Sequence, residues 1–261
     1  MNQMLLKPTG YLGPLRLTSA SKVREWPAQA NGFSLPAIRE VCTYATPTCW
    51  RGCYAKRGRM GFPTPQQAFM ANYRALARAR TPERMAELLI ELLDWMRFGI
   101  FRIHVSGEFF SLDYAEAWRL TCAEYEDAQF WSYTRSRESA VLTVLADVPN
   151  LRILLSCDRD NWEEMLAVSD DFPGFGLTYY TVAETPPEAV YARGAEVPKG
   201  KALGLIVFPD RSVRRALALP GTCPTEVAVK PWPKIQACVR CGRCCGLRQA
   251  TTGAQGKRGV K

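Results

Sequence analysis

Hydrophobic positions between residues 61 and 99 recur at helical spacing and predict two helices. The first helix begins near Thr64. In the second, Thr81 provides an N-cap, Pro82 suits the first turn, and Gly99 marks the end. We expect the apolar stripe of this second helix to pack into the core; it comprises Met85, Leu88, Leu89, Leu92, Leu93 and Met96.

Beyond residue 99, short apolar runs alternate with segments of helix length. This alternation is typical of βαβ units, which build a parallel sheet with right-handed crossovers. With one further strand near the first cysteines, the pattern predicts an α/β fold of about six βα units, either a partial (βα)6 barrel or an open parallel sheet. The expected strands are residues 100–106, 129–134, 151–156, 175–181 and 202–208.

Changes in composition divide the chain into three regions. Residues 1–40 are rich in Pro and Gly and predict an irregular N-terminal cap, and residues 41–210 hold the βα array. Residues 211–261 form a cysteine-rich extension that ends in a polar, basic tail, which we expect to be disordered. No apolar run approaches the ~20 residues needed to cross a bilayer. The N-terminus lacks a secretory signal pattern, so we expect a cytoplasmic protein.

Charge and cysteine content narrow the class of protein further. The chain of 261 residues carries 34 basic and 25 acidic residues, a net charge of +9. This excess suits a polyanionic partner such as DNA or RNA, although an ordinary basic enzyme fits it equally well. Because ten cysteines in a reducing cytoplasm are not expected to pair as disulfides, they favour metal or iron–sulfur ligation.

The first cysteine cluster comprises Cys42, Cys49 and Cys53, with six and then three intervening residues. Three thiolates on a [4Fe–4S] cluster leave one iron open to a cofactor or substrate. Of the isolated cysteines, Cys122 lies on an apolar helical stripe and is expected to be buried. Cys157 follows a predicted strand at the end where barrel active sites are built, so it is a candidate catalytic residue.

The second cluster comprises Cys238, Cys241 and Cys244, with two residues between neighbours, and Cys223 lies upstream. Three cysteines at this spacing with one remote cysteine are typical of ferredoxin-type [4Fe–4S] ligation. A structural four-cysteine zinc site is the alternative. A zinc site needs two pairs of cysteines, and here the second pair would have to share a cysteine with the first or be completed by Cys223. The pattern therefore favours an iron–sulfur cluster. Cys245 is an alternative fourth ligand.

Polar residues accumulate on and after the predicted strands. Strand 100–106 alternates, with Arg102, His104 and Ser106 on the face expected to line the interior. His104, the only histidine, is a candidate catalytic residue, and its alternative role is that of a hydrogen-bonded core residue. Arg135 either pairs with a carboxylate or phosphate or caps the next helix. Further polar residues end the later strands, which favours an active site on this edge; they are Ser156, Asp158, Thr181 and Glu184.

Strand 100–106 runs directly into Ser106, Gly107 and Glu108. An early loop with three cysteines, followed by a parallel βα array and this tripeptide, resembles the radical S-adenosylmethionine enzymes. In that superfamily three cysteines hold a [4Fe–4S] cluster whose open iron binds S-adenosylmethionine, and a Gly-Gly-Glu-like motif contacts the methionine amino group. The resemblance covers residues 40–210, and the C-terminal cysteines are similar to the auxiliary clusters of many members.

The cysteine spacing departs from the usual three and then two residues, and Tyr54 follows the last cysteine where the usual motif has an aromatic residue before it. A wide spacing with a Cys-Tyr-Ala ending resembles a group of bacteriophage-type proteins. Some phages use a radical S-adenosylmethionine isomerase to rearrange an amino acid attached to thymidine in DNA. This resemblance implies an enzyme that modifies a nucleic acid base, acting in the host cytoplasm if phage-encoded.

The expected cofactors are two [4Fe–4S] clusters and S-adenosylmethionine, and the expected partners are DNA or a nucleotide and an electron donor such as flavodoxin or ferredoxin. The alternative function is a zinc-stabilised, non-catalytic nucleic-acid-binding protein. A third possible function is that of an iron–sulfur enzyme that cleaves S-adenosylmethionine in a different way. The candidate site consists of catalytic His104, Arg135 and Cys157, cofactor-binding Ser106, Gly107, Glu108 and Ser156, and the metal ligands Cys42, Cys49, Cys53, Cys223, Cys238, Cys241 and Cys244.

Overall fold

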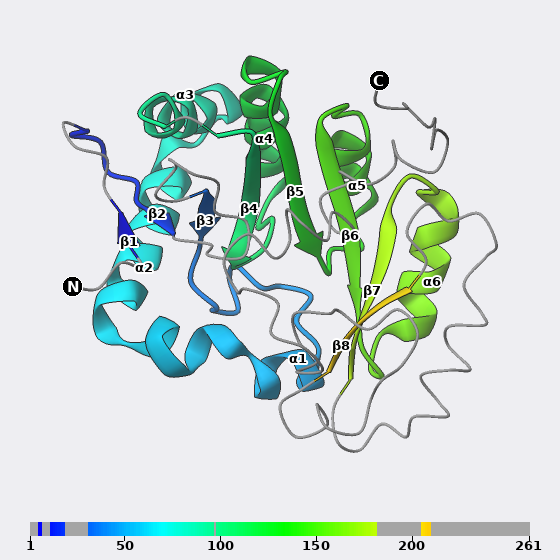
Figure 1. Ribbon diagram of the computed structural model, residues 1–261. Coiled ribbons are helices and arrows are strands. Elements are labelled where there is room, and N and C mark those ends of the chain that lie inside the picture. Colours follow the sequence, from blue (N-terminus) through cyan, green and yellow to red (C-terminus); the bar gives the residue numbers. More distant parts are fainter. Residues whose placement is uncertain (1–4, 7–10, 19–30, 97, 182–204, 210–261) are drawn as a thin grey trace, which may run out of the picture.

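The computed structural model describes residues 5–6, 11–18, 31–96, 98–181 and 205–209 (Figure 1). The basic tail and Glu184 lie outside the described residues. The second cysteine cluster also lies outside them, so its predicted ligands stay predictions; they are Cys223, Cys238, Cys241, Cys244 and the alternative Cys245.

The described strands form one sheet in the order β1-β2-β3-β4-β5-β6-β7-β8. The pairs β1–β2 and β2–β3 are antiparallel, whereas every pair from β3 to β8 is parallel. The strands are β1 (Leu5–Leu6), β2 (Leu17–Thr18), β3 (Gly32–Ser34), β4 (Ile100–Ser106), β5 (Gln129–Thr134), β6 (Leu151–Cys157), β7 (Gly176–Thr181) and β8 (Leu205–Pro209).

The predicted α/β class and the parallel sheet are confirmed. The parallel part has six strands, β3 to β8, and β3 is the additional strand expected ahead of the first cysteines. The partial barrel stays a prediction, and among the described strands β8 does not pair with β1. The N-terminal region is less irregular than predicted, because it contributes three strands to the sheet. The sequence did not reveal them because they are too short to show a periodic pattern.

Helices connect the parallel strands. They are α1 (Pro47–Gly52), α2 (Pro63–Ala79), α3 (Pro82–Leu93), α4 (Leu112–Glu124), α5 (Ser139–Ala146) and α6 (Trp162–Asp171), with 3-10 turns at Tyr54–Lys56 and Gly58–Gly61. Thr81 caps α3 as predicted by accepting a hydrogen bond from the Arg84 amide, but this helix ends at Leu93, ahead of Gly99. Among the described helices, none combines the length and the apolar composition that a bilayer crossing requires.

The core lies between the sheet and the helices α2 to α6. Trp118 of α4 is fully buried, with its ring 6.0 Å from those of Phe33 on β3 and Phe101 on β4. The predicted stripe of α3 faces this core: Met85, Leu89, Leu92 and Leu93 are buried, and Leu88 and Met96 pack against them in part. Burial of each such side chain stabilises the fold by about 1.5–3 kcal/mol.

A buried amide side chain fastens α2 to the N-terminal strands. Oδ1 of Asn72 accepts a hydrogen bond from the backbone N–H of Arg16 at 2.7 Å. Its amide group donates to the carbonyl oxygens of Arg16 and Ser34, both at 2.9 Å. Because α2 follows the first cysteine cluster in the chain, this contact also limits where the end of the cysteine-bearing loop can lie. Figure 1 shows α1 beyond the arrowheads of β4 and β5, at the carboxyl edge of the sheet.

Candidate functional site

The three cysteines of the first cluster lie close together at the carboxyl edge of the sheet. All three cysteines are half-buried. Burial raises the pKa of Cys42 to about 12, and the neighbouring Glu108, Cys49 and Cys53 shift it in the same direction. Burial also raises the pKa of Cys49, whereas the positive charge of Arg135 lowers it. The loop therefore brings three thiols near one carboxylate and one guanidinium.

These thiols are suited in chemistry to a soft metal or an iron–sulfur cluster, since thiolate sulfur is the preferred donor for both zinc and iron–sulfur centres. Within the described part of the chain, however, no three or more His, Cys, Asp and Glu side chains are arranged to hold a single metal ion. The raised pKa values of Cys42 and Cys49 mean that a bound metal must displace their protons. Cluster binding is therefore a proposal that rests on the donor set.

Gly107 follows β4 in a conformation that favours glycine. Its φ is +94°, and an added Cβ would lie 2.5 Å from Cβ of Leu35. The close approach is maintained by a hydrogen bond from the Leu35 amide to the Ser106 carbonyl at 2.8 Å. A side chain at position 107 would both strain the backbone and push against the β3 segment. The turn after Ser106 is thus restricted to glycine, and it directs the chain into Glu108.

Glu108 is buried and bridges the ends of β4 and β5. Its Oε1 accepts hydrogen bonds from the Phe109 amide at 2.9 Å and the Thr134 hydroxyl at 2.8 Å, and its Oε2 accepts from the Arg135 amide at 2.7 Å. Burial raises the pKa of Glu108, while these hydrogen bonds and the Arg135 charge lower it. A carboxylate offers about four acceptor positions, and these three donors occupy three of them.

Arg135 extends this network toward β6. Its NH1 atom lies 2.8 Å from Oδ2 of Asp158, and both side chains are buried, with exposed fractions of 10% and 0%. Of the two predicted roles for Arg135, pairing with a carboxylate is the one that the structure bears out. Asp158 does not cap the following helix, because α6 begins at Trp162 and Asn161 occupies its N-cap position.

His104 lies in a different environment from the one predicted. It contacts α4 through a 3.1 Å hydrogen bond between Nε2 and the Tyr114 hydroxyl, and its ring packs edge-on against Phe109 at 4.6 Å. Burial, with a smaller effect of Arg102, lowers its pKa to about 3, so the ring is neutral. The contacts fit the alternative interpretation, a hydrogen-bonded core residue. Nδ1 of His104 also contacts the Ser132 hydroxyl at 3.4 Å. The predicted alternation of the two faces along β4 therefore does not hold at His104.

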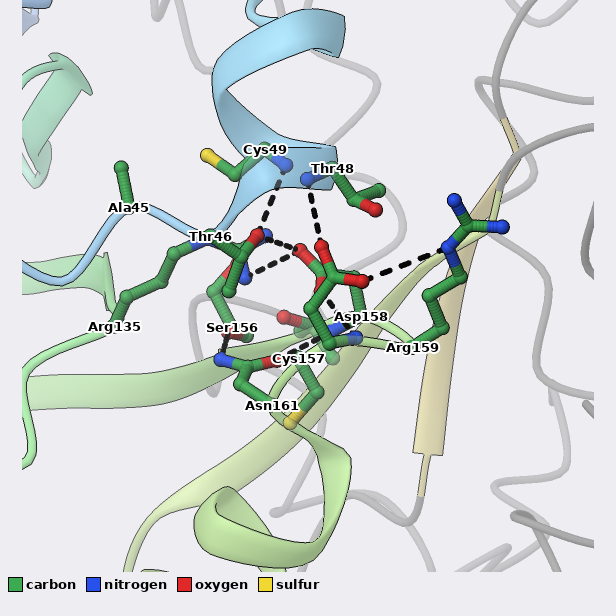
Figure 2. A network of polar contacts seen from close by, with 12 residues as sticks. Ala45, Thr46, Thr48, Cys49, Arg135, Ser156, Cys157, Asp158, Arg159 and Asn161 are labelled. Carbon is green, nitrogen blue, oxygen red and sulfur yellow. Dashed lines mark hydrogen bonds and ion pairs between the residues drawn. The ribbon is translucent and has the colours of Figure 1, made fainter.

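Cys157 and Ser156 differ in their relation to the site. Cys157 is fully buried, its sulfur contacts the Leu155 carbonyl at 3.8 Å, and burial raises its pKa to about 12. Figure 2 shows its side chain directed away from α1, on the opposite side from Cys49. The structure thus places Cys157 in the core beside α6 rather than with the other thiols. Ser156 lies at the carboxyl edge, where its carbonyl accepts a hydrogen bond from Asn161 at 3.3 Å.

Two contributors to the site were not predicted. The hydroxyl of Tyr54 donates to the Val105 carbonyl and accepts from Arg102 at 3.3 Å, which fastens the end of the cysteine loop to β4. Thr46 is the N-cap of α1 and contacts Asp158. The Thr46-Pro47 pair is a recognisable helix start, but α1 has only six residues and gives no periodic signal.

The chain is similar to proteins of bacteriophages. The family described as Gene product 88 matches residues 7–246. The Gene 88 protein of Mycobacterium phage D29 is 30% identical over 140 residues, which cover 51% of this chain and 58% of that protein. The Gene 88 protein of Mycobacterium phage L5 is 27% identical over 229 residues, 84% of each chain. No solved structure matches.

We predict that Gly107→Ala lowers the free energy of unfolding by about 3 kcal/mol, because it adds backbone strain and a steric overlap with Leu35. Gly174→Ala is the matched control, since a Cβ there meets nothing within 4 Å, and its effect should stay within about 0.5 kcal/mol. Urea unfolding of both variants measures the difference. Equal stabilities would show that the turn after β4 tolerates a side chain.

We predict that His104 makes the folded protein less stable in acid. Its folded-state pKa is about 3, below the ordinary 6.5, so between these values the unfolded chain binds a proton that the folded chain does not. Stability should therefore fall with decreasing pH, by up to about 1.4 kcal/mol per unit. His104→Gln should lose about 2–3 kcal/mol less than the wild type between pH 7 and pH 4.5 in urea unfolding. Identical losses would mean that the buried ring accepts a proton.

Proposed function

This chain belongs to the Gene product 88 family, and we propose that it is an iron–sulfur, S-adenosylmethionine-dependent radical enzyme that rearranges or modifies a nucleic acid base. The observation that carries the proposal is the gathering of the Cys42, Cys49 and Cys53 thiols beside the anchored Glu108 carboxylate. These groups lie at the carboxyl ends of parallel strands, where open α/β sheets bind their ligands.

In this proposal the three thiolates hold a [4Fe–4S] cluster and leave one iron open. The bound cluster would supply the electron that splits S-adenosylmethionine into methionine and a 5′-deoxyadenosyl radical, which takes a hydrogen atom from the substrate. The partial barrel of such enzymes fits the six parallel strands. A second [4Fe–4S] cluster on Cys223, Cys238, Cys241 and Cys244 and an electron donor such as flavodoxin or ferredoxin complete the proposal.

The chain's own groups would bind and orient the cofactor. Glu108 has one acceptor position beyond its three fixed donors, which suits the ammonium group of the methionine moiety. Arg135 carries five N–H donors and uses one in the ion pair with Asp158, so its guanidinium can also bind an anionic group. Ser106 and Gly107 set the position of Glu108, and Ser156 lies at the same edge of the sheet.

The nucleic-acid part of the proposal rests on charge and on the phage relatives. The net charge is +9, and the loop that carries the cysteines has four exposed basic residues, Arg51, Lys56, Arg57 and Arg59. Such residues next to an active site attract a polyanion. A base that reacts inside an enclosed site must leave the stack, so single-stranded or already modified DNA would be the preferred substrate.

We predict that anaerobically purified protein contains about eight irons per chain, as two four-iron clusters require. Cys49→Ala should lose about half of this iron and all reductive cleavage of S-adenosylmethionine in the presence of dithionite. Cys241→Ala should lose the other half and keep cleavage. Cys122→Ala is the matched control, because this buried core thiol lies outside the proposed ligand sets. Stoichiometric zinc with little iron would instead favour the structural zinc alternative.

We predict that binding to a DNA oligomer weakens linearly on a log–log plot against salt, with a slope near −3 to −4 for about four phosphate contacts. Replacing both Arg57 and Arg59 with Gln should make this slope shallower by about 2. Arg78→Gln, an exposed charge on α2, is the control and should leave the slope unchanged. A wild-type protein that does not bind DNA even at low salt would contradict the nucleic-acid part alone.

A further inference from the structure

The helix that carries Cys49 is held on the sheet by side chains from the β6–α6 connection. The Thr46 hydroxyl accepts a hydrogen bond from the Cys49 amide at 3.0 Å and donates to Oδ2 of Asp158 at 2.6 Å. Asp160 accepts from the neighbouring Thr48 amide at 2.7 Å. Figure 2 shows these contacts, with α1 placed directly over the end of β6. A six-residue helix is too short to be stable alone, so these contacts determine where it lies.

Asp158 is at the centre of this arrangement. Its side chain is fully buried, and its Oδ2 accepts a hydrogen bond from the Thr46 hydroxyl and forms an ion pair with the Arg135 guanidinium. Its Oδ1 accepts a hydrogen bond from the Asp160 amide at 2.9 Å. This contact orients the loop from which the Asp160 side chain binds the Thr48 amide. The Asp158 carboxylate therefore contacts the cysteine-bearing helix, the end of β5 and its own loop. Asparagine at this position would replace one acceptor oxygen with a donor and could not satisfy all of these groups.

We propose that Asp158 is a positioning residue that, through Thr46, fixes the backbone at Cys49 relative to Arg135 and Glu108. Arg135 is held from both sides, by its amide on Glu108 and by its guanidinium on Asp158. One series of contacts thus runs from Glu108 to Cys49. The identity of what Cys49 binds rests on the proposed function, but the positioning itself is a property of the protein without a cluster.

Amide hydrogen exchange in the cluster-free protein tests this proposal directly. Thr46→Val keeps the shape of the side chain but removes both hydrogen bonds, so exchange at the Cys49 amide should rise by roughly fivefold, as expected for a lost N-cap. Thr46→Ser retains both hydrogen bonds and should exchange like the wild type. Asp158→Asn should accelerate exchange at both Cys49 and Thr48. Asp170→Asn, an exposed position on α6, is the control and should change neither amide.

The amides of α3 report on global stability in the same experiment. If Asp158→Asn does not fold, because it alters a buried ion pair, the Thr46 pair of variants decides. Unchanged exchange at Cys49 in Thr46→Val would overturn the proposal. An equal acceleration in α3 would also overturn it, since the role would then be general stability.

A second measurement separates this proposal from the proposed function. In reconstituted protein, Thr46→Val should lower the iron content or change the electron paramagnetic resonance signal of the reduced cluster, and Thr46→Ser should restore the wild-type signal. A wild type that binds no iron, together with the expected exchange result, would reject the proposed function and leave the positioning role standing. If the iron content and the electron paramagnetic resonance signal were identical in all variants, the proposal that these contacts position Cys49 for metal binding would be contradicted.

Discussion

The buried ion pair between Arg135 and Asp158 is the interaction on which the candidate site depends. A buried charge is costly unless it is paired, and here the guanidinium lies 2.8 Å from the carboxylate, which also accepts hydrogen bonds from the Thr46 hydroxyl and the Asp160 amide. The pair joins the carboxyl ends of β5 and β6, and further contacts lead from it to Glu108 on one side and to Thr46 on the other. Three neighbouring strands and the cysteine loop are therefore linked by polar contacts rather than by apolar packing.

The parallel sheet brings the residues of this polar network close together. Parallel strands bring their carboxyl ends to one edge, so residues that follow β4, β5 and β6 become neighbours although they are separated in sequence. Behind this edge, large aromatic side chains of the core, such as Phe130 of β5 and Trp118 of α4, pack the sheet against the helices. A rigid apolar layer thus supports a polar edge, and the edge needs only short connections to bring its functional groups together.

Much of this could be predicted from local patterns. The alternation of strands and helices indicated the parallel sheet, and the spacing of Cys42, Cys49 and Cys53 indicated converging thiols, because both signals lie within a short stretch of chain. The contact between Thr46 and Asp158 spans 112 positions, and nothing near either residue specifies the other. Likewise, the orientation of His104 depends on Tyr114 in the following helix, so alternation along the strand could not locate its side chain.

The amide side chain of Asn72 has a consequence for how much of the chain the fold requires. It bonds to both backbone groups of Arg16 and to the carbonyl of Ser34. If the chain were shortened to begin after Arg16, a buried amide in α2 would lose two of its three bonds, and each buried group left unsatisfied costs about 1–3 kcal/mol. The N-terminal segment is consequently part of the folding unit, and a minimal version of this protein cannot start at the cysteine loop.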